Sequence, residues 1–192
     1  MSGERELAIA GGRRLRAFTE HDGDELHALI ERNRDELARW MSWAKQTPAQ
    51  TLDFVRRALA SEAENGSLQR AIIANRQIVG TVGLPTIDWA NRSSEIGYWL
   101  DERERGRGTM TAAVAVLVGH AFDELALNRL EIRTDVENAR SRAVAERLGF
   151  QCEGIARQSY RVDDERYSDD AVYSLLASDA ARRALAAHAS AA

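Results

Sequence analysis

The stretch from Tyr98 to Val118 constrains the fold of this chain more than any other segment. It starts as an apolar strand-like run, continues through the basic glycine loop Arg105-Gly-Arg-Gly108, and ends in an apolar helical run. Such a loop gathers backbone N–H groups and a helix N-terminus around one point, which favours a bound phosphate. The spacing excludes the G-x-x-x-x-G-K-[ST] loop, and the third glycine of G-x-G-x-x-G is missing. The sequence therefore predicts a phosphate site of another type.

Apolar patterns indicate a mixed α/β fold, with a central, mostly antiparallel sheet flanked by helices. The expected strands are short apolar runs, at 15–18, 68–74, 78–84, 94–100, 130–134, 150–153 and 171–176. The expected helices have apolar residues at helical spacing, at 26–41, 52–65, 110–125, 138–148 and 180–187. Thr51 is expected to cap the second helix and Gly149 to close the fourth. One domain is expected over 1–192, with its core at about 13–179 and a fraying alanine-rich C-terminus.

Composition narrows the functional classes. The chain has 192 residues, enough to bury a core, and its formal net charge of −4 argues against a nucleic-acid binder that relies on bulk electrostatics. No apolar run approaches the roughly 20 residues that span a bilayer, and no signal peptide is expected. The single cysteine, Cys152, excludes an internal disulfide, fits a reducing cytoplasm and is expected to be a buried structural thiol. The histidines are scattered, and no Cys/His cluster indicates a metal site.

Four segments together resemble one protein family. They are Ile96-Gly-Tyr-Trp-Leu-Asp101, Arg105-Gly-Arg-Gly-Thr-Met110, Asn138-Ala-Arg-Ser141 and Glu146-Arg-Leu-Gly-Phe150. In this order they are similar to the GNAT superfamily of N-acetyltransferases, and in particular to its RimL/RimJ-like group of ribosomal-protein amino-terminal acetyltransferases. Trp40-Met-Ser-Trp43 resembles the W-x-x-W of that group. The broad superfamily has Gly or Ala at the position of Met110, whereas RimL-like proteins often have Met there, so this residue resembles the RimL-like group.

The resemblance implies that acetyl-CoA is the cofactor and that its pyrophosphate lies against the glycine loop. The implied cofactor-binding residues are Trp99, Leu100, Arg105, Gly106, Arg107, Gly108, Thr109, Met110, Thr111, Asn138 and Ser141. In the family the pantetheine arm pairs with the strand before the loop, where Gly97 suits a bulge that splays this strand from its neighbour. A backbone N–H near Trp99 or Leu100 is expected to polarise the thioester carbonyl. A solvated turn is the alternative for the loop.

The resemblance also implies a proton donor but leaves the general base open. The Ser141 hydroxyl is expected to protonate the departing thiolate; helix-start roles are the alternative for Asn138 and Ser141. RimL-like enzymes carry a glutamate after the Glu153-Gly154 pair, but the corresponding stretch 157–161 holds no carboxylate. Glu95 and Glu131 are therefore the two candidate catalytic carboxylates. An ion pair with neighbouring arginines is the alternative for both.

The acceptor is expected to be a primary amine that attacks the thioester directly. An α-amino group, with a pKa near ~7.7–8.0, is partly neutral at pH 7, so a site without a strong base suits a protein N-terminus better than a lysine. Trp40, Trp43 and Tyr98 are the candidate acceptor-binding residues, with apolar core packing as the alternative.

Other readings of the function stay open. A polyamine, an aminoglycoside or an aminoacyl-nucleotide antibiotic is the alternative acceptor, because specificity within a fold lies in its loops. A non-catalytic acyl-CoA-binding module is the alternative to an enzyme. A homodimer would cover the edge that such a sheet leaves free.

Overall fold

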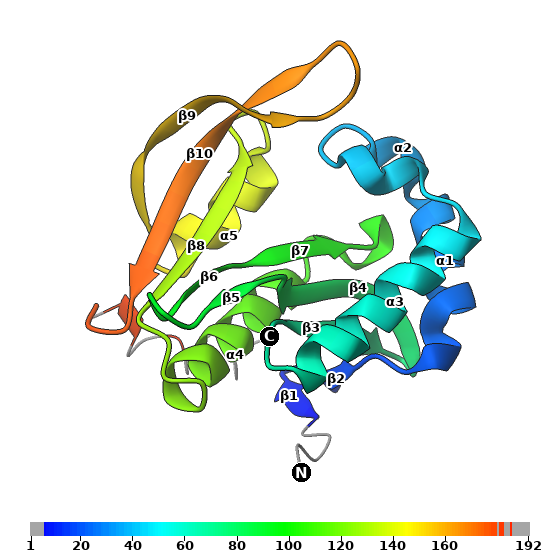
Figure 1. The fold of residues 1–192 in the computed structure, drawn as a ribbon, viewed down its shortest axis with the longest axis horizontal. Helices are drawn as coiled ribbons and strands as arrows, with labels where there is room; N and C mark the ends of the chain where they lie inside the picture. Colours follow the sequence, from blue (N-terminus) through cyan, green and yellow to red (C-terminus); the bar gives the residue numbers. More distant parts are fainter. Residues whose placement is uncertain (1–5, 180, 183–184, 186–192) are drawn as a thin grey trace.

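The computed structural model describes residues 6–179, 181–182 and 185, which form two five-stranded sheets and the helices around them (Figure 1). The strands of the first sheet are, in spatial order, β1 (Leu7–Ile9), β2 (Arg13–Ala17), β3 (Leu68–Ala74), β4 (Gln77–Leu84) and β7 (Gly97–Leu100). Those of the second sheet are β5 (Ile87–Asp88), β6 (Ser93–Glu95), β8 (Arg129–Asp135), β10 (Tyr167–Leu176) and β9 (Gln151–Arg161). All pairs are antiparallel except β6 with β8. The mixed α/β class is confirmed, but the strands form two sheets where one central sheet is predicted.

The division between the sheets falls inside the run 94–100, which the sequence predicts to be one strand. Glu95 of β6 lies opposite Glu131 of β8, whereas Tyr98 of β7 lies opposite Val82 of β4. The Ile96 N–H still donates to the Glu131 carbonyl oxygen at 2.7 Å. The chain therefore passes from one sheet to the other at Gly97, the position at which the sequence predicts a bulge.

The predicted helix at 26–41 is interrupted at Asn33. α1 (Gly23–Arg32) ends there, and the short α2 (Arg34–Leu37) and the 3-10 turn η2 (Ser42–Lys45) follow. Asn33 is buried; its Nδ2 donates to the Leu29 carbonyl oxygen at 2.9 Å, and its Oδ1 accepts from the Glu102 N–H at 3.0 Å. The long-range contact to Glu102 could not be foreseen from apolar spacing, which carries on through this position.

The next helix, α3 (Pro48–Ala63), begins one turn earlier than predicted, because Thr47 and not Thr51 is its N-cap. The Thr47 hydroxyl accepts from the Gln50 N–H at 3.3 Å, and the Gln50 side chain accepts from the Thr47 N–H at 2.8 Å. Proline at the first helical position supports this start. Thr51 is buried inside the helix, with its hydroxyl 3.0 Å from His27 Nδ1.

The other elements follow the prediction more closely. They are α4 (Thr109–Asp123) and α5 (Ala139–Arg147). The 3-10 turn η1 (Glu20–Asp22) precedes α1, and the 3-10 turn η3 (Glu102–Glu104), which follows β7, is not predicted. Gly149 has a φ of +79°, which agrees with its predicted place just beyond α5. β9 runs well beyond the predicted 150–153, and β1 is a strand that the sequence analysis does not predict. Most of the predicted helix at 180–187 lies outside the described residues.

Two apolar cores lie on the two faces of the first sheet. α4 packs on one face of this sheet, and its Val114 and Leu117 are fully buried in a core that also includes Leu130 of β8. On the opposite face, α1 and α3 pack Leu29 and Val55 against the sheet. No helix in the described part of the chain is long and apolar enough to cross a membrane.

Close packing of β4 against β7 yields a stability prediction. A Cβ added at Gly80 would lie 2.4 Å from the Trp99 carbonyl oxygen, so Gly80→Ala must push β7 away. We expect this substitution to lower the free energy of unfolding by about 1–3 kcal/mol in urea denaturation. Gly119→Ala is the matched control, since a Cβ there meets nothing within 4 Å. In the middle of α4 it should raise that free energy by about 0.5–1 kcal/mol. Equal urea midpoints for Gly80→Ala and Gly119→Ala would contradict the close packing of β4 against β7.

Candidate active site

A cleft of about 1190 Å³ opens where the two sheets diverge. Its walls come from β7, the loop 105–108 with the start of α4, α5, and the α2–η2 segment. Successive N–H groups of a strand point to opposite sides, and the Asp101 N–H donates to the Val79 carbonyl oxygen of β4 at 2.7 Å. The N–H groups of Tyr98 and Leu100 therefore point away from β4, toward the second sheet. That of Trp99 points to β4, so of the two predicted positions Leu100 has the N–H on the cleft side.

The predicted phosphate loop forms one end of the cleft. Gly106 and Gly108 have φ values of +75° and +73°, a left-handed conformation that glycine adopts without steric cost. Gly108 is the N-cap of α4, and the first helical hydrogen bond runs from the Ala112 N–H to the Gly108 carbonyl oxygen at 3.0 Å. The N–H groups of residues 109–111 precede that bond and lie at the positive end of the helix.

Two further features of the loop fit a phosphate group. The Thr109 Oγ1 is buried and has no hydrogen-bond partner among the described residues. A Cβ at Gly106 would meet no atom within 4 Å, so open space adjoins the loop. A buried hydroxyl without a partner is unfavourable, and an anion at this helix N-terminus would supply the acceptor.

The arginines of the loop are paired with carboxylates. Arg107 lies 3.1 Å from Glu104, and Arg105 lies 3.3 Å from Glu36 of α2. Glu36 also lies 3.3 Å from Arg140 of α5, so this one carboxylate connects three walls of the cleft. Arg147 of α5 donates to the Thr111 hydroxyl at 2.9 Å. Glu36, Arg140 and Arg147 all line the cleft, and the sequence analysis assigns a role to none of them.

The start of α5 brings Asn138 and Ser141 to the cleft. Asn138 Oδ1 accepts from the Ser141 N–H at 3.1 Å, which makes Asn138 the N-cap of the helix, as one of its two predicted roles requires. The Ser141 hydroxyl lies 2.9 Å from the Tyr98 hydroxyl of β7. Burial raises the pKa of Tyr98 to about 12, so this phenol is neutral at physiological pH.

Glu95 lies at the end of β6, on the wall of the cleft. The surrounding protein raises the pKa of its carboxyl group by restricting solvation, and the nearby carboxylates of Glu131 and Asp170 raise it further. Arg133, which also lines the cleft, opposes this shift. A carboxylate with a raised pKa is a stronger proton acceptor than an ordinary glutamate.

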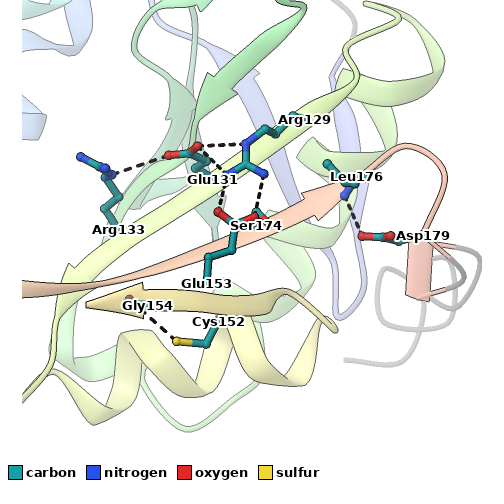
Figure 2. A network of polar contacts seen from close by, with 9 residues as sticks. All are labelled: Arg129, Glu131, Arg133, Cys152, Glu153, Gly154, Ser174, Leu176 and Asp179. Atoms are coloured by element: carbon teal, nitrogen blue, oxygen red, sulfur yellow. Dashed lines mark hydrogen bonds and ion pairs between the residues drawn. The ribbon is translucent and has the colours of Figure 1, made fainter. Parts of the chain in front are cut away.

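Glu131 lies beside Glu95 but is held in an ion-pair network, shown in Figure 2. Arg129 donates to Glu131 at 2.8 and 3.0 Å, and Arg133 lies 3.6 Å from it. Arg129 also donates to Glu153 at 2.6 and 2.8 Å. Together with the Ser174 hydroxyl, Arg129 lowers the pKa of Glu153 to about 2. Glu131 is not among the residues that line the cleft, so its surroundings match the ion-pair alternative.

The predicted aromatic residues all line the cleft, and two of them also serve the packing. Trp43 lies in η2, with its ring centroid 6.1 Å from that of Trp99, which is buried in the core under α1 and α3. Trp40 follows α2, and the Arg39 guanidinium lies 5.0 Å from the centroid of its ring. Tyr98, the third of the set, contacts Ser141. Trp43 and Tyr98 thus both line the cleft and pack against the apolar cores.

The far end of the cleft is bridged by the hairpin of β9 and β10, which arches toward α2 in Figure 1. The Tyr160 hydroxyl accepts from the Ser42 N–H at 3.1 Å and lies 2.7 Å from the Ser42 hydroxyl. Arg166 donates to the Arg39 carbonyl oxygen. Asp170 lines the cleft under this bridge and accepts from the Ser159 and Ser168 hydroxyls, each at 2.9 Å. None of these contacts could be predicted from the sequence. They join segments more than 100 residues apart, or they lie within a hairpin whose first strand is longer than the predicted one.

The expectation for Cys152 is wrong. The residue is exposed at the start of β9, an edge strand that is exposed along most of its length. Local apolar character does not reveal which strand forms the edge of a sheet.

Comparisons with known proteins agree with this geometry. The model of the family described as "Acetyltransferase (GNAT) domain" matches residues 13–151. YdaF of Bacillus subtilis (strain 168) is 34% identical over 167 residues, which cover 84% of this chain and 90% of YdaF. The structure of RimL, a ribosomal L7/L12 alpha-N-protein acetyltransferase in complex with coenzyme A, superposes with a TM-score of 0.85 at 25% identity, covering 90% of this chain and 98% of RimL.

A second similar solved structure is that of another acetyltransferase. It is the Microcin C7 self immunity acetyltransferase MccE in complex with acetyl-CoA and AMP, with a TM-score of 0.80 at 26% identity, covering 85% of this chain and 92% of MccE. Family model, sequence relative and solved structures agree on the class of protein. The chain belongs to the GNAT acetyltransferase family.

Proposed function

We propose that this protein transfers the acetyl group of acetyl-CoA to the α-amino group of a protein N-terminus, with a ribosomal protein as the first candidate acceptor. The observation that carries the acetyl-CoA part of the proposal is the Thr109 hydroxyl, which is buried without a hydrogen-bond partner among the described residues, at a helix N-terminus beside the open glycine loop. The likeness to RimL supports the choice of acceptor.

Acetyl-CoA would be held by the backbone of the loop and of β7. The N–H groups of residues 109–111 and the Thr109 hydroxyl would bind the pyrophosphate, and Arg105 and Arg107 would add positive charge. Leu100, whose N–H points to the cleft side of β7, would donate to the thioester carbonyl oxygen and stabilise the negative charge that develops there. When bound, acetyl-CoA supplies an activated acyl group.

Two side chains would then move protons in a single transfer. The neutral amine nitrogen forms a bond to the acyl carbon, and the carbon–sulfur bond breaks. Glu95, directly or through water, accepts the proton that the amine nitrogen gives up. Ser141 donates its hydroxyl proton to the sulfur and regains one from solvent, and Glu95 releases to solvent the proton that it accepted. The products are then an amide and a free thiol, with no net change in protons.

The electrostatics of Glu95 support an α-amine over a lysine. A carboxylate remains a modest base even with a raised pKa. An α-amino group with a pKa near ~7.7–8.0 is neutral for roughly a tenth of the time at pH 7, whereas a lysine at about 10.4 is neutral some hundreds of times less often. An α-amino group, which needs little help from a base, therefore suits this cleft better than a lysine.

A small-molecule amine is the second candidate acceptor. The likeness to MccE, solved with acetyl-CoA and AMP, favours an aminoacyl nucleotide within this class, and the acidic Glu95 and Asp170 would also suit a polyamine or an aminoglycoside. The donor side of the site and the chemistry would be the same for both candidates.

Thr109→Val tests the donor site directly. We expect the affinity for coenzyme A, measured by isothermal titration calorimetry, to fall about tenfold, because one hydrogen bond to an anion is lost. The free protein should be as stable as the wild type or more so, since an apolar group of the same shape replaces a hydroxyl without a partner. Ser67→Ala is the control: Ser67 Oγ is likewise buried without a partner, but the residue lies outside the cleft, so coenzyme A affinity should not change. An unchanged affinity in Thr109→Val would contradict the assignment.

The function itself is tested by thiol release from acetyl-CoA with a panel of amines. The panel holds peptides that begin with Ser or Ala, each with a free or a blocked α-amine, together with spermidine, an aminoglycoside and an aminoacyl-adenylate analogue. Turnover on the free peptides that disappears on blocking is the expected result. Turnover on the small amines alone would replace the proposal with the second candidate. Coenzyme A binding without any turnover would indicate a non-catalytic module.

A further inference from the structure

Tyr98 makes a contact that the proposed transfer step does not use. Its side chain leaves β7, just past the point where the two sheets divide, and reaches the first turn of α5. There its hydroxyl lies 2.9 Å from the Ser141 hydroxyl and 3.2 Å from the Ser141 carbonyl oxygen. The contact joins residues 43 positions apart, from the two walls between which the cleft opens.

The hydrogen-bond capacity of these groups limits what the contact can be. A phenol carries one proton, and a serine hydroxyl carries one proton and two lone pairs. Because burial keeps Tyr98 protonated, it is available as a donor at neutral pH. The Tyr98 proton has two acceptors within reach, Ser141 Oγ at 2.9 Å and the Ser141 carbonyl oxygen at 3.2 Å. When Tyr98 donates across the shorter contact, to Ser141 Oγ, the Ser141 proton is left for a different acceptor. The Ser141 N–H is already bonded to Asn138 Oδ1 at 3.1 Å, which holds the backbone of this turn in place.

We propose that Tyr98 is a positioning residue for Ser141: it donates a hydrogen bond to Ser141 Oγ and so leaves the Ser141 proton directed into the cleft, toward the departing sulfur. The inference rests on the proposed role of Ser141 as proton donor. This role would stand beside the acceptor contact expected of Tyr98, which also lines the cleft.

Tyr98 would keep the Ser141 hydroxyl from turning toward the backbone of its own helix. A serine in a helix readily turns its hydroxyl back to donate to the carbonyl oxygen three or four residues earlier, and in that state its proton faces its own backbone. A donor placed at Oγ opposes this rotation. It also polarises the serine O–H bond, because hydrogen bonds in a chain strengthen one another.

The test is a double-mutant cycle on Tyr98→Phe and Ser141→Ala, read as kcat and as KM for acetyl-CoA with the amine that gives turnover in the panel above. Ser141→Ala should lower kcat about 100-fold, the lower end of the usual contribution of a general acid. Tyr98→Phe should lower kcat about three- to tenfold, the range of one neutral hydrogen bond, with KM for acetyl-CoA unchanged. In the Ser141→Ala background, Tyr98→Phe should have no further effect on kcat.

Tyr173→Phe is the matched control. Tyr173 also anchors α5: its hydroxyl accepts from Arg142 Nε at 3.0 Å and donates to Glu146 at 2.7 Å, but it does not contact Ser141. The Tyr173→Phe substitution should leave kcat at the wild-type value. If it lowers kcat as much as Tyr98→Phe does, anchoring of the helix explains the loss and the positioning role is overturned.

Each remaining outcome would overturn either the inference or the proposed function. Multiplicative losses in the double variant would show that Tyr98 acts independently of Ser141 and would overturn the inference. An unchanged kcat in Ser141→Ala would overturn it through its premise, while leaving acetyl transfer itself intact. A wild-type protein that binds coenzyme A but acetylates no amine would instead overturn the proposed function.

Discussion

Replacing Glu95 by glutamine is expected to lower kcat/KM for acetyl transfer about 100-fold at pH 7, the lower end of the usual contribution of a general base. Glutamine keeps the shape and hydrogen-bonding capacity of the side chain but accepts no proton. Glu95 is exposed on the cleft wall, where restricted solvation by the surrounding protein and the neighbouring carboxylates of Glu131 and Asp170 raise its pKa. The loss should therefore appear in the transfer step, with the affinity for coenzyme A unchanged in calorimetry.

The pH dependence of the same variant is a sharper test. A base acts as the carboxylate, so wild-type activity should fall as the pH is lowered through the pKa of Glu95, which lies above the ordinary value of 4.5. Protonation of the acceptor amine also lowers the rate, but equally in both proteins. The ratio of wild-type to Glu95→Gln activity should thus be constant at high pH and decline below the pKa of Glu95. A ratio that does not change with pH would contradict a role as base.

Glu131→Gln separates the two candidate carboxylates. Glu131 is adjacent to Glu95 across β6 and β8 and is bound by Arg129, so its substitution should change activity much less than Glu95→Gln does. The reverse order of effects would make Glu131 the base and would require Arg129 to release it during the reaction.

Gly106→Val is expected to weaken coenzyme A binding about 100-fold, the equivalent of losing one or two hydrogen bonds to a charged group. Gly106 has a φ of +75°, and a side chain there would project into the open space beside the loop. The substitution therefore both strains the loop and fills the volume in which the pyrophosphate is proposed to lie.

Gly12→Val controls for backbone strain alone. Gly12 has a φ of +73°, a Cβ there would also meet nothing within 4 Å, and the residue lies outside the cleft. Both variants should lose similar stability in thermal unfolding, and Gly12→Val should bind coenzyme A like the wild type. If both variants lose affinity equally, the effect belongs to strain and not to the loop.

The parts of the fold that the sequence predicts are those in which local pattern and tertiary contact agree. The meander of β3 and β4, the glycine loop and α4 are such cases, because α4 is apolar nearly all round and is buried along most of its length. Asn33 shows the opposite case: its helical surroundings hide a break that depends on a contact with Glu102. Thr51 fails for a local reason, since a better capping box with proline lies at Thr47.

The site divides in the same way. The glycine loop and the start of α4 form one continuous segment, so spacing alone brings Gly106, Gly108 and Thr109 together. The rest of the cleft is assembled from segments far apart in the chain, and no local motif predicts that Glu36, Asp170 or Tyr160 lines it. The choice between Glu95 and Glu131 depended on which of them Arg129 binds, and only the arrangement of β8, β9 and β10 reveals that.

Tandem mass spectrometry can test the proposed preference for an α-amine over a lysine amine. A Ser-initiated peptide that carries a free α-amine and one internal lysine is analysed after reaction with acetyl-CoA and the protein at pH 7. The account predicts acetylation of the α-nitrogen and an unmodified lysine, because Glu95 is too weak a base to maintain a useful fraction of neutral lysine. Acetylation of the lysine at a comparable rate would contradict it.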